Sequence, residues 1–132
     1  MPKIMVVDDE KSIVYLIKVL LEREQFEVAE AYDGLEAYNA LAAAAPGSLP
    51  DLMILDTMMP VMDGYTLQAR LRETAGLDKI PIVILTGKDS QTRELFALAD
   101  NIFAFMEKPF KPKDLVKTVK DALAAAKAKR NP

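Results

Sequence analysis

Carboxylates stand at the ends of two short apolar runs, and they are the side chains best suited to chemistry. Asp8 and Asp9 follow the run over residues 3–7, and Asp56 follows the run over residues 52–55. A continuous apolar run is typical of a strand covered on both faces, so a charge at its end must lie where the sheet meets solvent. In an open parallel sheet, that edge is where ligands bind. Asp56 is therefore the leading candidate for a reactive residue.

These three carboxylates need a positive charge if they lie together. Two carboxylates about 4 Å apart repel by roughly 4 kcal/mol at an effective dielectric near 20. The chain contains no histidine and no cysteine, which excludes a Ser-His-Asp triad, a histidine general base, disulfides and thiolate metal sites. Any metal must then be a hard, oxygen-ligated ion such as Mg²⁺.

Two further residues complete a possible reaction site. Thr86 and Lys108 lie just after two other predicted strands. With Mg²⁺ and the Lys108 ammonium neutralising phosphoryl oxygens, and Thr86 donating a hydrogen bond to one of them, Asp56 can attack phosphorus. The product would be an aspartyl phosphate.

Alternating apolar runs and amphipathic segments predict the elements that carry these residues. Strands are expected over residues 3–7, 26–31, 52–55, 82–85 and 102–106, and helices over 11–24, 35–45, 65–73, 89–99 and from 112 onward. Short connections between alternating strands and helices force right-handed crossovers. We therefore predict an α/β fold, (βα)5: a doubly wound parallel five-stranded sheet in the flavodoxin-like order 2-1-3-4-5, with helices on both faces.

Apolar spacing predicts the buried side of the first and last helices. Asp9 is expected to cap the first helix. The residues expected to be buried on the first helix are Ile13, Leu16, Ile17, Leu20 and Leu21. Those expected to be buried on the last helix are Leu115, Val119, Ala122, Leu123 and Ala126.

Length and charge set the broad class of protein. The 132 residues suit one domain, expected over residues 1–123, with an Ala/Lys-rich tail over 124–132 that frays or continues into further sequence. No apolar run approaches the ~18 residues needed to span a bilayer, and the N-terminus is not typical of a signal peptide. The formal net charge of −3 disfavours direct binding of nucleic acid. We expect a cytoplasmic protein.

Four motifs occur in order over nearly the whole chain: VVDDE at residues 6–10, ILDTMMPVMDG at 54–64, ILTGK at 84–88 and KPF at 108–110. With them the chain resembles a two-component response regulator receiver domain. The resemblance implies that Asp56 is the phosphoacceptor, with Mg²⁺ as cofactor and Mn²⁺ as a substitute. It also implies roles for the remaining site residues: Asp8, Asp9 and the Met58 backbone carbonyl bind the metal, Thr86 and Lys108 bind the phosphoryl group, Lys108-Pro109 is a cis peptide, and Phe105 is the aromatic switch residue.

The same resemblance implies a phosphorylation-activated switch. A sensor histidine kinase or phosphotransfer protein would dock against the first helix and supply the phosphoryl group. Thr86 would then move inward, Phe105 would follow, and the face formed by the segments 89–99, 102–106 and 112 onward would bind a protein target. The chain would catalyse only its own phosphorylation and dephosphorylation, and would be a monomer or a phosphorylation-dependent dimer. It would bind neither nucleic acid nor membrane directly.

Some residues depart from the family pattern. The usual Gly-Ala pair before the last strand is replaced within residues 98–101, so that loop is expected to differ in shape. Phe105 lacks a hydroxyl often present at its position, and Phe103, two residues away, is expected on the same face of the strand. Lys88, two residues after Thr86, is expected to be solvated and to alter the lifetime of the phosphoryl group.

Two other functional classes remain as alternatives. A phosphohydrolase of the dehalogenase type would carry its nucleophile after the first strand with a second aspartate two residues on, where this chain has Glu10, and it would need a substrate cap. A flavin carrier would bring the flavin phosphate against Asp8, Asp9 and Glu10, which would repel it. The sequence also leaves open whether this is a single-domain regulator or part of a longer one.

Overall fold

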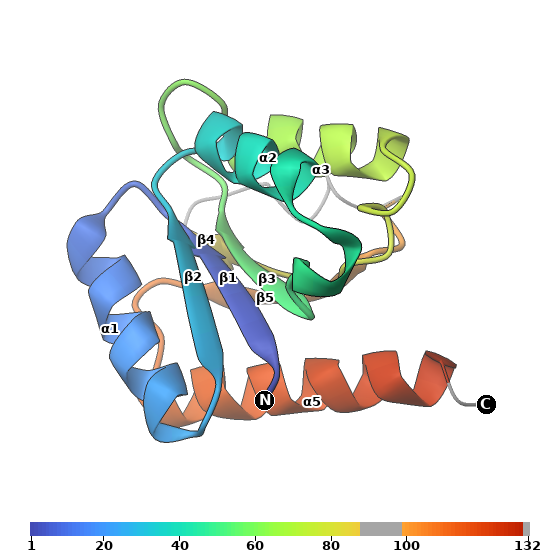
Figure 1. Ribbon diagram of the computed structural model, residues 1–132. Coiled ribbons are helices and arrows are strands. Elements are labelled where there is room, and N and C mark those ends of the chain that lie inside the picture. The colour runs from blue at the N-terminus through green and yellow to red at the C-terminus, as the bar shows by residue number, and fades with distance from the viewer. Residues whose placement is uncertain (88–98, 131–132) are drawn as a thin grey trace.

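The computed structural model describes residues 1–87 and 99–130 of the chain. A parallel five-stranded sheet has the order β2-β1-β3-β4-β5 (Figure 1), which confirms the predicted topology. The strands are β1 (Lys3–Val7), β2 (Glu27–Ala31), β3 (Leu52–Asp56), β4 (Ile82–Thr86) and β5 (Ile102–Glu107). Because β3 and β4 each run one residue further than predicted, Asp56 and Thr86 are the last residues of their strands.

Helices cover both faces of the sheet (Figure 1). They are α1 (Lys11–Arg23), α2 (Gly34–Ala43), α3 (Gly64–Glu73) and α5 (Pro112–Arg130), with a short 3₁₀ helix, η1 (Pro46–Ser48), before β3. Helices α1 and α5 pack on one face, and α2 and α3 pack on the other. The predicted helix over 89–99 lies almost wholly outside the described residues, and so does Lys88.

Alternating side chains of the central strands enter two separate hydrophobic clusters. Along β3, Leu52 and Ile54 pack with α1 and α5, whereas Met53 and Leu55 pack with α2 and α3. All four are fully buried, and burying each such side chain stabilises the fold by about 1.5 to 3 kcal/mol. This two-sided burial holds the end of β3, and hence Asp56, in a fixed place.

Two details of α1 differ from the prediction. The fully buried positions are Val14, Ile17 and Leu21, whereas Leu16 is 41% exposed, because the helix turns this flank of the predicted stripe away from the sheet. Asp9 does not cap the helix. The N-cap residue is Glu10, and its own amide donates to Asp8 Oδ1 at 3.0 Å.

Strand β5 contains a register shift. Ile82 pairs with Ile102 but Val83 pairs with Ala104, so Phe103 is an extra residue opposite β4. Such a bulge disrupts the strand pairing locally. Phe103 is 41% exposed, whereas Phe105 packs against the α2–α3 cluster, so the two residues differ in burial, and that they share a face stays a prediction.

Helix α5 buries Leu115, Val119 and Ala122, as its pattern predicted. It continues without a break to Arg130, so residues 124–130 are helical rather than frayed. The domain boundary expected at residue 123 stays a prediction. In the described part of the chain, no helix is both long enough and apolar enough to cross a bilayer.

Candidate functional site

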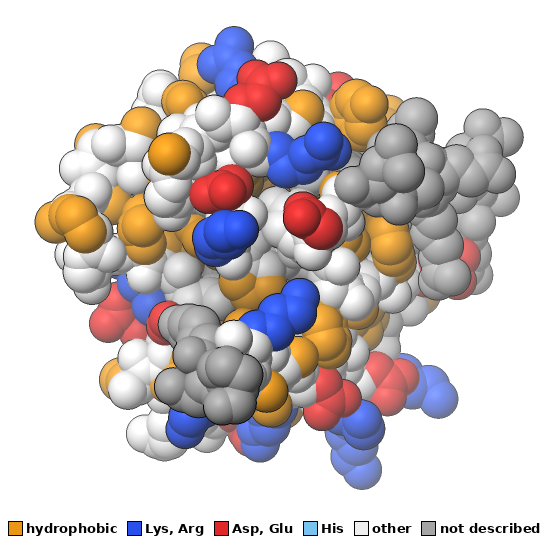
Figure 2. Space-filling view, turned by 90° about the vertical axis from the view of Figure 1, so that its right-hand side faces the viewer, with side chains coloured by type: hydrophobic (Ala, Val, Ile, Leu, Met, Phe, Trp, Pro, Cys, Tyr) orange, Lys and Arg blue, Asp and Glu red, His pale blue; other side chains and the backbone are white. Residues whose placement is uncertain are grey.

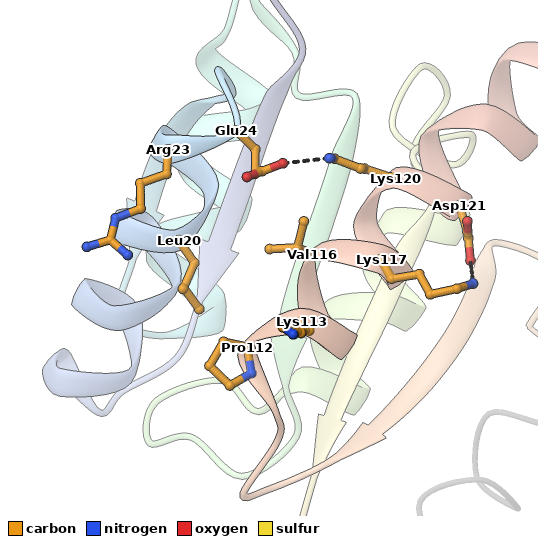
Figure 3. A pocket seen from close by; sticks show the side chains of 9 residues that line it. All are labelled: Leu20, Arg23, Glu24, Pro112, Lys113, Val116, Lys117, Lys120 and Asp121. Carbon is orange, nitrogen blue, oxygen red and sulfur yellow. Dashed lines mark hydrogen bonds and ion pairs between the residues drawn. The ribbon is translucent and has the colours of Figure 1, made fainter.

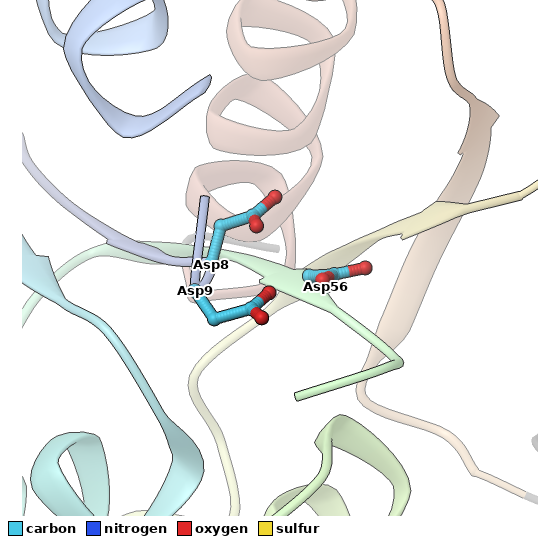
Figure 4. Close-up of side chains that lie close together, drawn as sticks. All are labelled: Asp8, Asp9 and Asp56. Carbon is cyan, nitrogen blue, oxygen red and sulfur yellow. The ribbon is translucent and has the colours of Figure 1, made fainter. Parts of the chain in front are cut away.

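The carboxyl edge of the parallel sheet brings the predicted site residues together. Asp56 is the last residue of β3, Asp8 follows β1 directly, and Lys108 follows β5 directly. Figure 4 shows the side chains of Asp8, Asp9 and Asp56 at the ends of β1 and β3. One carboxylate oxygen from each of the three lies within 4.8 Å of the others.

The loop after Asp56 is folded tightly back on the strand. The amide of Gly64 donates to the carbonyl of Thr57 at 3.0 Å, and Asp63 caps α3 by accepting from the amide of Thr66 at 2.7 Å. A Cβ atom on Gly64 would collide with the backbone of Asp56. Glycine is therefore required at this position for the end of β3 to keep its shape.

Among the described residues, Lys108 supplies the positive charge of the site. Its Nζ lies 2.7 Å from Asp8 Oδ2, 3.5 Å from Asp56 Oδ1 and 3.7 Å from Glu10 Oε1. Asp8 is fully buried and Asp56 is 6% exposed, whereas Asp9 and Glu10 are exposed. One ammonium is thus shared by three carboxylates, two of which are buried.

The crowding changes the acidity of these groups. Burial, and then the charge of Asp8, raise the pKa of Asp56 from 3.8 to about 6, although Lys108 and the amide of Met58 oppose this rise. Burial alone would lower the pKa of Lys108, but its hydrogen bond to Asp8 and the charges of Asp56, Asp8 and Glu10 raise it. Lys108 therefore stays positively charged, but its ammonium does not fully offset the cost of a negative charge on the buried Asp56.

The donor set fits a hard divalent cation. Asp8, Asp9 and Asp56 offer only carboxylate oxygens, which are the ligands that Mg²⁺ prefers. In the described part of the chain one ammonium faces these carboxylates and does not balance them, so a cation would relieve their repulsion. Met58 lies two residues beyond Asp56 with its side chain 80% exposed, and the role of its backbone carbonyl as a metal ligand stays a prediction.

Thr86 links the ends of β4 and β5. Its carbonyl accepts from the amide of Lys108 at 2.8 Å, and its hydroxyl donates to the carbonyl of Met106 at 3.5 Å, a long and weak bond. The Lys108-Pro109 peptide is cis, as the resemblance implied. The roles predicted for Thr86 and Phe105 in switching are not tested by this geometry.

Glu10 is a member of the site to which the sequence had assigned no role. Its carboxylate reaches Lys108 from the solvent side, and its amide holds Asp8. Its position directly after Asp8 and Asp9 was the available signal, but nothing in the spacing showed that Lys108 lies within reach.

The comparisons with known proteins agree with this geometry. The family model of the response regulator receiver domain matches residues 4–120. The phosphate regulon transcriptional regulatory protein PhoB of Rhizobium meliloti is 37% identical over 127 residues, which are 96% of this chain and 54% of that protein. The alkaline phosphatase synthesis transcriptional regulatory protein PhoP of Bacillus subtilis is 39% identical over 121 residues, 92% of this chain and 48% of that protein. The chain spans about half the length of these curated relatives.

Solved structures show the same fold over most of this chain. The chemotaxis response regulator CheY4 of Vibrio cholerae has a TM-score of 0.82 at 30% identity, and the match covers 92% of this chain and 98% of CheY4. The receiver domain of the Francisella response regulator 1452 has a TM-score of 0.80 at 29% identity, covering 95% of this chain and 98% of that domain. Together with the match over residues 4–120, these similarities show that the chain belongs to the family of response regulator receiver domains.

Proposed function

We propose that the chain is a phosphorylation-activated switch of a two-component phosphorelay, with Asp56 as the phosphoacceptor. The observation that carries the proposal is the position of Asp56. It is buried at the end of β3, within 4.8 Å of carboxylate oxygens of Asp8 and Asp9, and 3.5 Å from the Lys108 ammonium. A bound cation would be stabilised by these neighbouring carboxylates, and positive charge beside Asp56 would assist its attack on phosphorus.

In the proposed reaction, an Asp56 oxygen attacks the phosphorus of a phosphohistidine on a sensor kinase or phosphotransfer protein. The new P–O bond forms as the P–N bond breaks, and the leaving imidazole takes up a proton. Lys108 and Thr86 would hold the phosphoryl oxygens. Mg²⁺, or Mn²⁺ in its place, would be held by Asp8, Asp9, Asp56 and the Met58 carbonyl, and when bound it would neutralise charge on the carboxylates and the phosphoryl group.

The weak bond of Thr86 supports its proposed part in switching. Its hydroxyl gives up little when it leaves the Met106 carbonyl at 3.5 Å for a phosphoryl oxygen. Phe105 precedes Met106 on β5, so a shift of Thr86 can be transmitted to it. The face formed by β5, α5 and the segment over residues 89–99 would then bind a protein target. The chain would do so as a monomer or as a phosphorylation-dependent dimer.

The phosphoryl donor is proposed to dock along α1. A groove of about 450 Å³ lies between α1 and α5 (Figure 3). Its apolar members Leu20 and Val116 lie between charged side chains, among them Arg23 and Lys113. Such an apolar strip with a charged rim is typical of a transient protein interface.

In this function the chain catalyses only its own phosphorylation and dephosphorylation. It would act as no enzyme toward outside substrates, would work in the cytoplasm, and would not bind nucleic acid through these residues, whose net charge is −3. Incubation with p-nitrophenyl phosphate checks the first point. Turnover of many equivalents would favour a phosphohydrolase instead, and its loss in Asp8→Asn with retention in Asp56→Asn would indicate the dehalogenase type, whose nucleophile follows the first strand.

Intact-mass measurement after incubation with acetyl phosphate and Mg²⁺ tests the proposal. The parent should gain one phosphoryl group, and Asp56→Asn should gain none. Asp78→Asn, a matched change in the loop after α3, should behave as the parent. If no adduct forms, beryllofluoride binding decides between two readings: binding indicates an adduct that hydrolyses quickly, and no binding refutes the phosphoacceptor role.

A further inference from the structure

Lys108 divides one positive charge among three carboxylates that differ in their exposure to solvent. Asp8 and Asp56 contact it from the buried side. Glu10 contacts it at 3.7 Å with a side chain that is 59% exposed, whereas the Lys108 side chain is 19% exposed. The Glu10 carboxylate therefore attracts the ammonium toward solvent, away from Asp56.

The backbone holds Glu10 in this arrangement. As N-cap residue of α1, Glu10 has an extended conformation with φ −84° and ψ 104°. Its amide donates to Asp8 Oδ1 at 3.0 Å, while Asp8 Oδ2 lies 2.7 Å from Lys108. Glu10 is thus tied to the same aspartate that binds Lys108.

The charges of the site give Glu10 a consequence for the bound phosphoryl group. Among the described residues, Asp8, Asp9, Asp56 and Glu10 carry four negative charges against one on Lys108, so a divalent cation would still leave one in excess. Phosphorylation of Asp56 replaces one negative charge by about two. A Glu10 carboxylate both repels that group and competes for the ammonium that should hold it.

We propose that Glu10 is a positioning residue that competes with Asp56 for Lys108 and so limits how tightly the site holds a phosphoryl group. The inference rests on the proposed function. It concerns the affinity and lifetime of the phosphoryl group, and it leaves the identity of the phosphoacceptor unchanged.

Titration with beryllofluoride in the presence of Mg²⁺, followed by NMR, tests this inference in the full chain. Glu10→Gln keeps the shape of the side chain and removes its charge, and it should bind beryllofluoride about threefold to fivefold tighter than the parent, the size expected for one unit charge near 4 Å in a water-like dielectric. The gain should shrink at high salt, because Glu10 is exposed. The lifetime of the aspartyl phosphate should lengthen by a similar factor.

Two further variants separate a contact from a general effect of charge. Glu73→Gln makes the same charge change at an exposed position on α3 and should leave the affinity unchanged. Glu10→Asp keeps the charge but shortens the reach to Lys108, and should give an intermediate gain. In metal-free protein, the Lys108 ammonium resonance should move in Glu10→Gln and stay in place in Glu73→Gln.

The outcomes are distinct. Equal affinity of Glu10→Gln and the parent, weaker binding by Glu10→Gln, or an equal gain in Glu73→Gln would each overturn the role of Glu10 while the phosphoacceptor role stands. Failure of the parent itself to bind beryllofluoride would overturn the proposed function, and this inference with it.

Discussion

The two edges of the sheet use polar residues in opposite ways. At the carboxyl edge, Asp8 and Asp56 are buried with one shared ammonium, and the pKa of Asp56 rises to about 6. At the amino edge, buried and half-buried polar groups carry little charge and most pair singly: Asp51 accepts from the amide of Lys3 at 2.9 Å, and Gln68 Nε2 donates to Asn101 Oδ1 at 3.0 Å. Asn101 Nδ2 has no partner among the described residues, but it is neutral.

The amino edge nevertheless has a sizeable hollow. A cavity of about 910 Å³ lies there, lined by loops before β3, β4 and β5 and by the end of α5. Figure 2 faces this end, and hydrophobic, basic and acidic side chains are mixed across it. A cavity by itself therefore does not mark the reactive edge, which is distinguished in the described part of the chain by buried carboxylates that outnumber their cation.

Glycine-to-alanine changes at the two edges of the sheet should differ most in their cost in folding stability. Gly64→Ala places a Cβ against the Asp56 backbone, which is fixed in the sheet, and should destabilise the fold by about 3 kcal/mol or more. Gly47→Ala in η1 meets nothing within 4 Å and should change stability by less than about 0.5 kcal/mol. Urea unfolding of both variants checks this, and similar costs at the two positions would contradict it.

Replacing one lysine at each edge by methionine should give the second-largest difference in folding stability. Lys108→Met leaves Asp8 and Asp56 buried without their ammonium and should cost about 3 kcal/mol at pH 7 in EDTA. Lys3→Met removes a long ion pair with Glu27 at 3.9 Å and an exposed hydrogen bond to the carbonyl of Ser48, and should cost about 1 kcal/mol or less. Urea unfolding with EDTA and then with Mg²⁺ should show partial recovery for Lys108→Met only. A loss that Mg²⁺ leaves untouched would argue against a shared cation site.

The raised pKa of Asp56 predicts a variant that is more stable than the parent. A carboxyl whose pKa rises on folding, here from 3.8 to about 6, weakens the fold as pH rises through that window, and the full cost is present at pH 7. Asp56→Asn in metal-free buffer should therefore gain about 1 to 3 kcal/mol at pH 7, and the gain should vanish near pH 4. Thermal unfolding across this pH range measures it. A gain that does not depend on pH would show that charge is not the cause.

The smallest effect compares two residues with left-handed backbones. Val61, in the loop after β3, has φ 66°, and Gln25, in the turn after α1, has φ 67°. A β-branched residue is strained more in this region than an unbranched one, and asparagine tolerates it well. Val61→Asn should therefore stabilise by about 1 kcal/mol, and Gln25→Asn by about half of that. Equal gains in thermal unfolding would mean that β-branching at Val61 adds no strain.

Local pattern was sufficient to predict most of the fold. The apolar runs predicted the bounds of all five strands to within one residue. The short connections predicted the strand order, because a parallel sheet with right-handed crossovers has few alternatives. The same pattern placed Asp8, Asp56, Thr86 and Lys108 at one edge, since the carboxyl ends of parallel strands must meet there.

Other features depended on which neighbour covers each side chain. Helical periodicity predicted which side of α1 faces the sheet, but not how far that side is rotated about the helix axis. Leu16 was therefore predicted to be buried although it is exposed, and the buried Val14 was left out of the predicted stripe. The register shift at Phe103 arises from the pairing of β5 with β4, which no pattern within β5 reveals.

Residue types and their positions were enough to predict the kind of chemistry: carboxylates at strand ends, a lysine closely following the last strand, and neither histidine nor cysteine. The balance of charge at the site became visible only in the folded structure. Residue type and spacing are local, whereas the attraction of Lys108 to Asp8, Asp56 and Glu10 depends on distances and burial between segments far apart in the chain. Coulomb energies vary with both, so the raised pKa of Asp56 and the contact of Glu10 appear only once the sheet has brought these segments together.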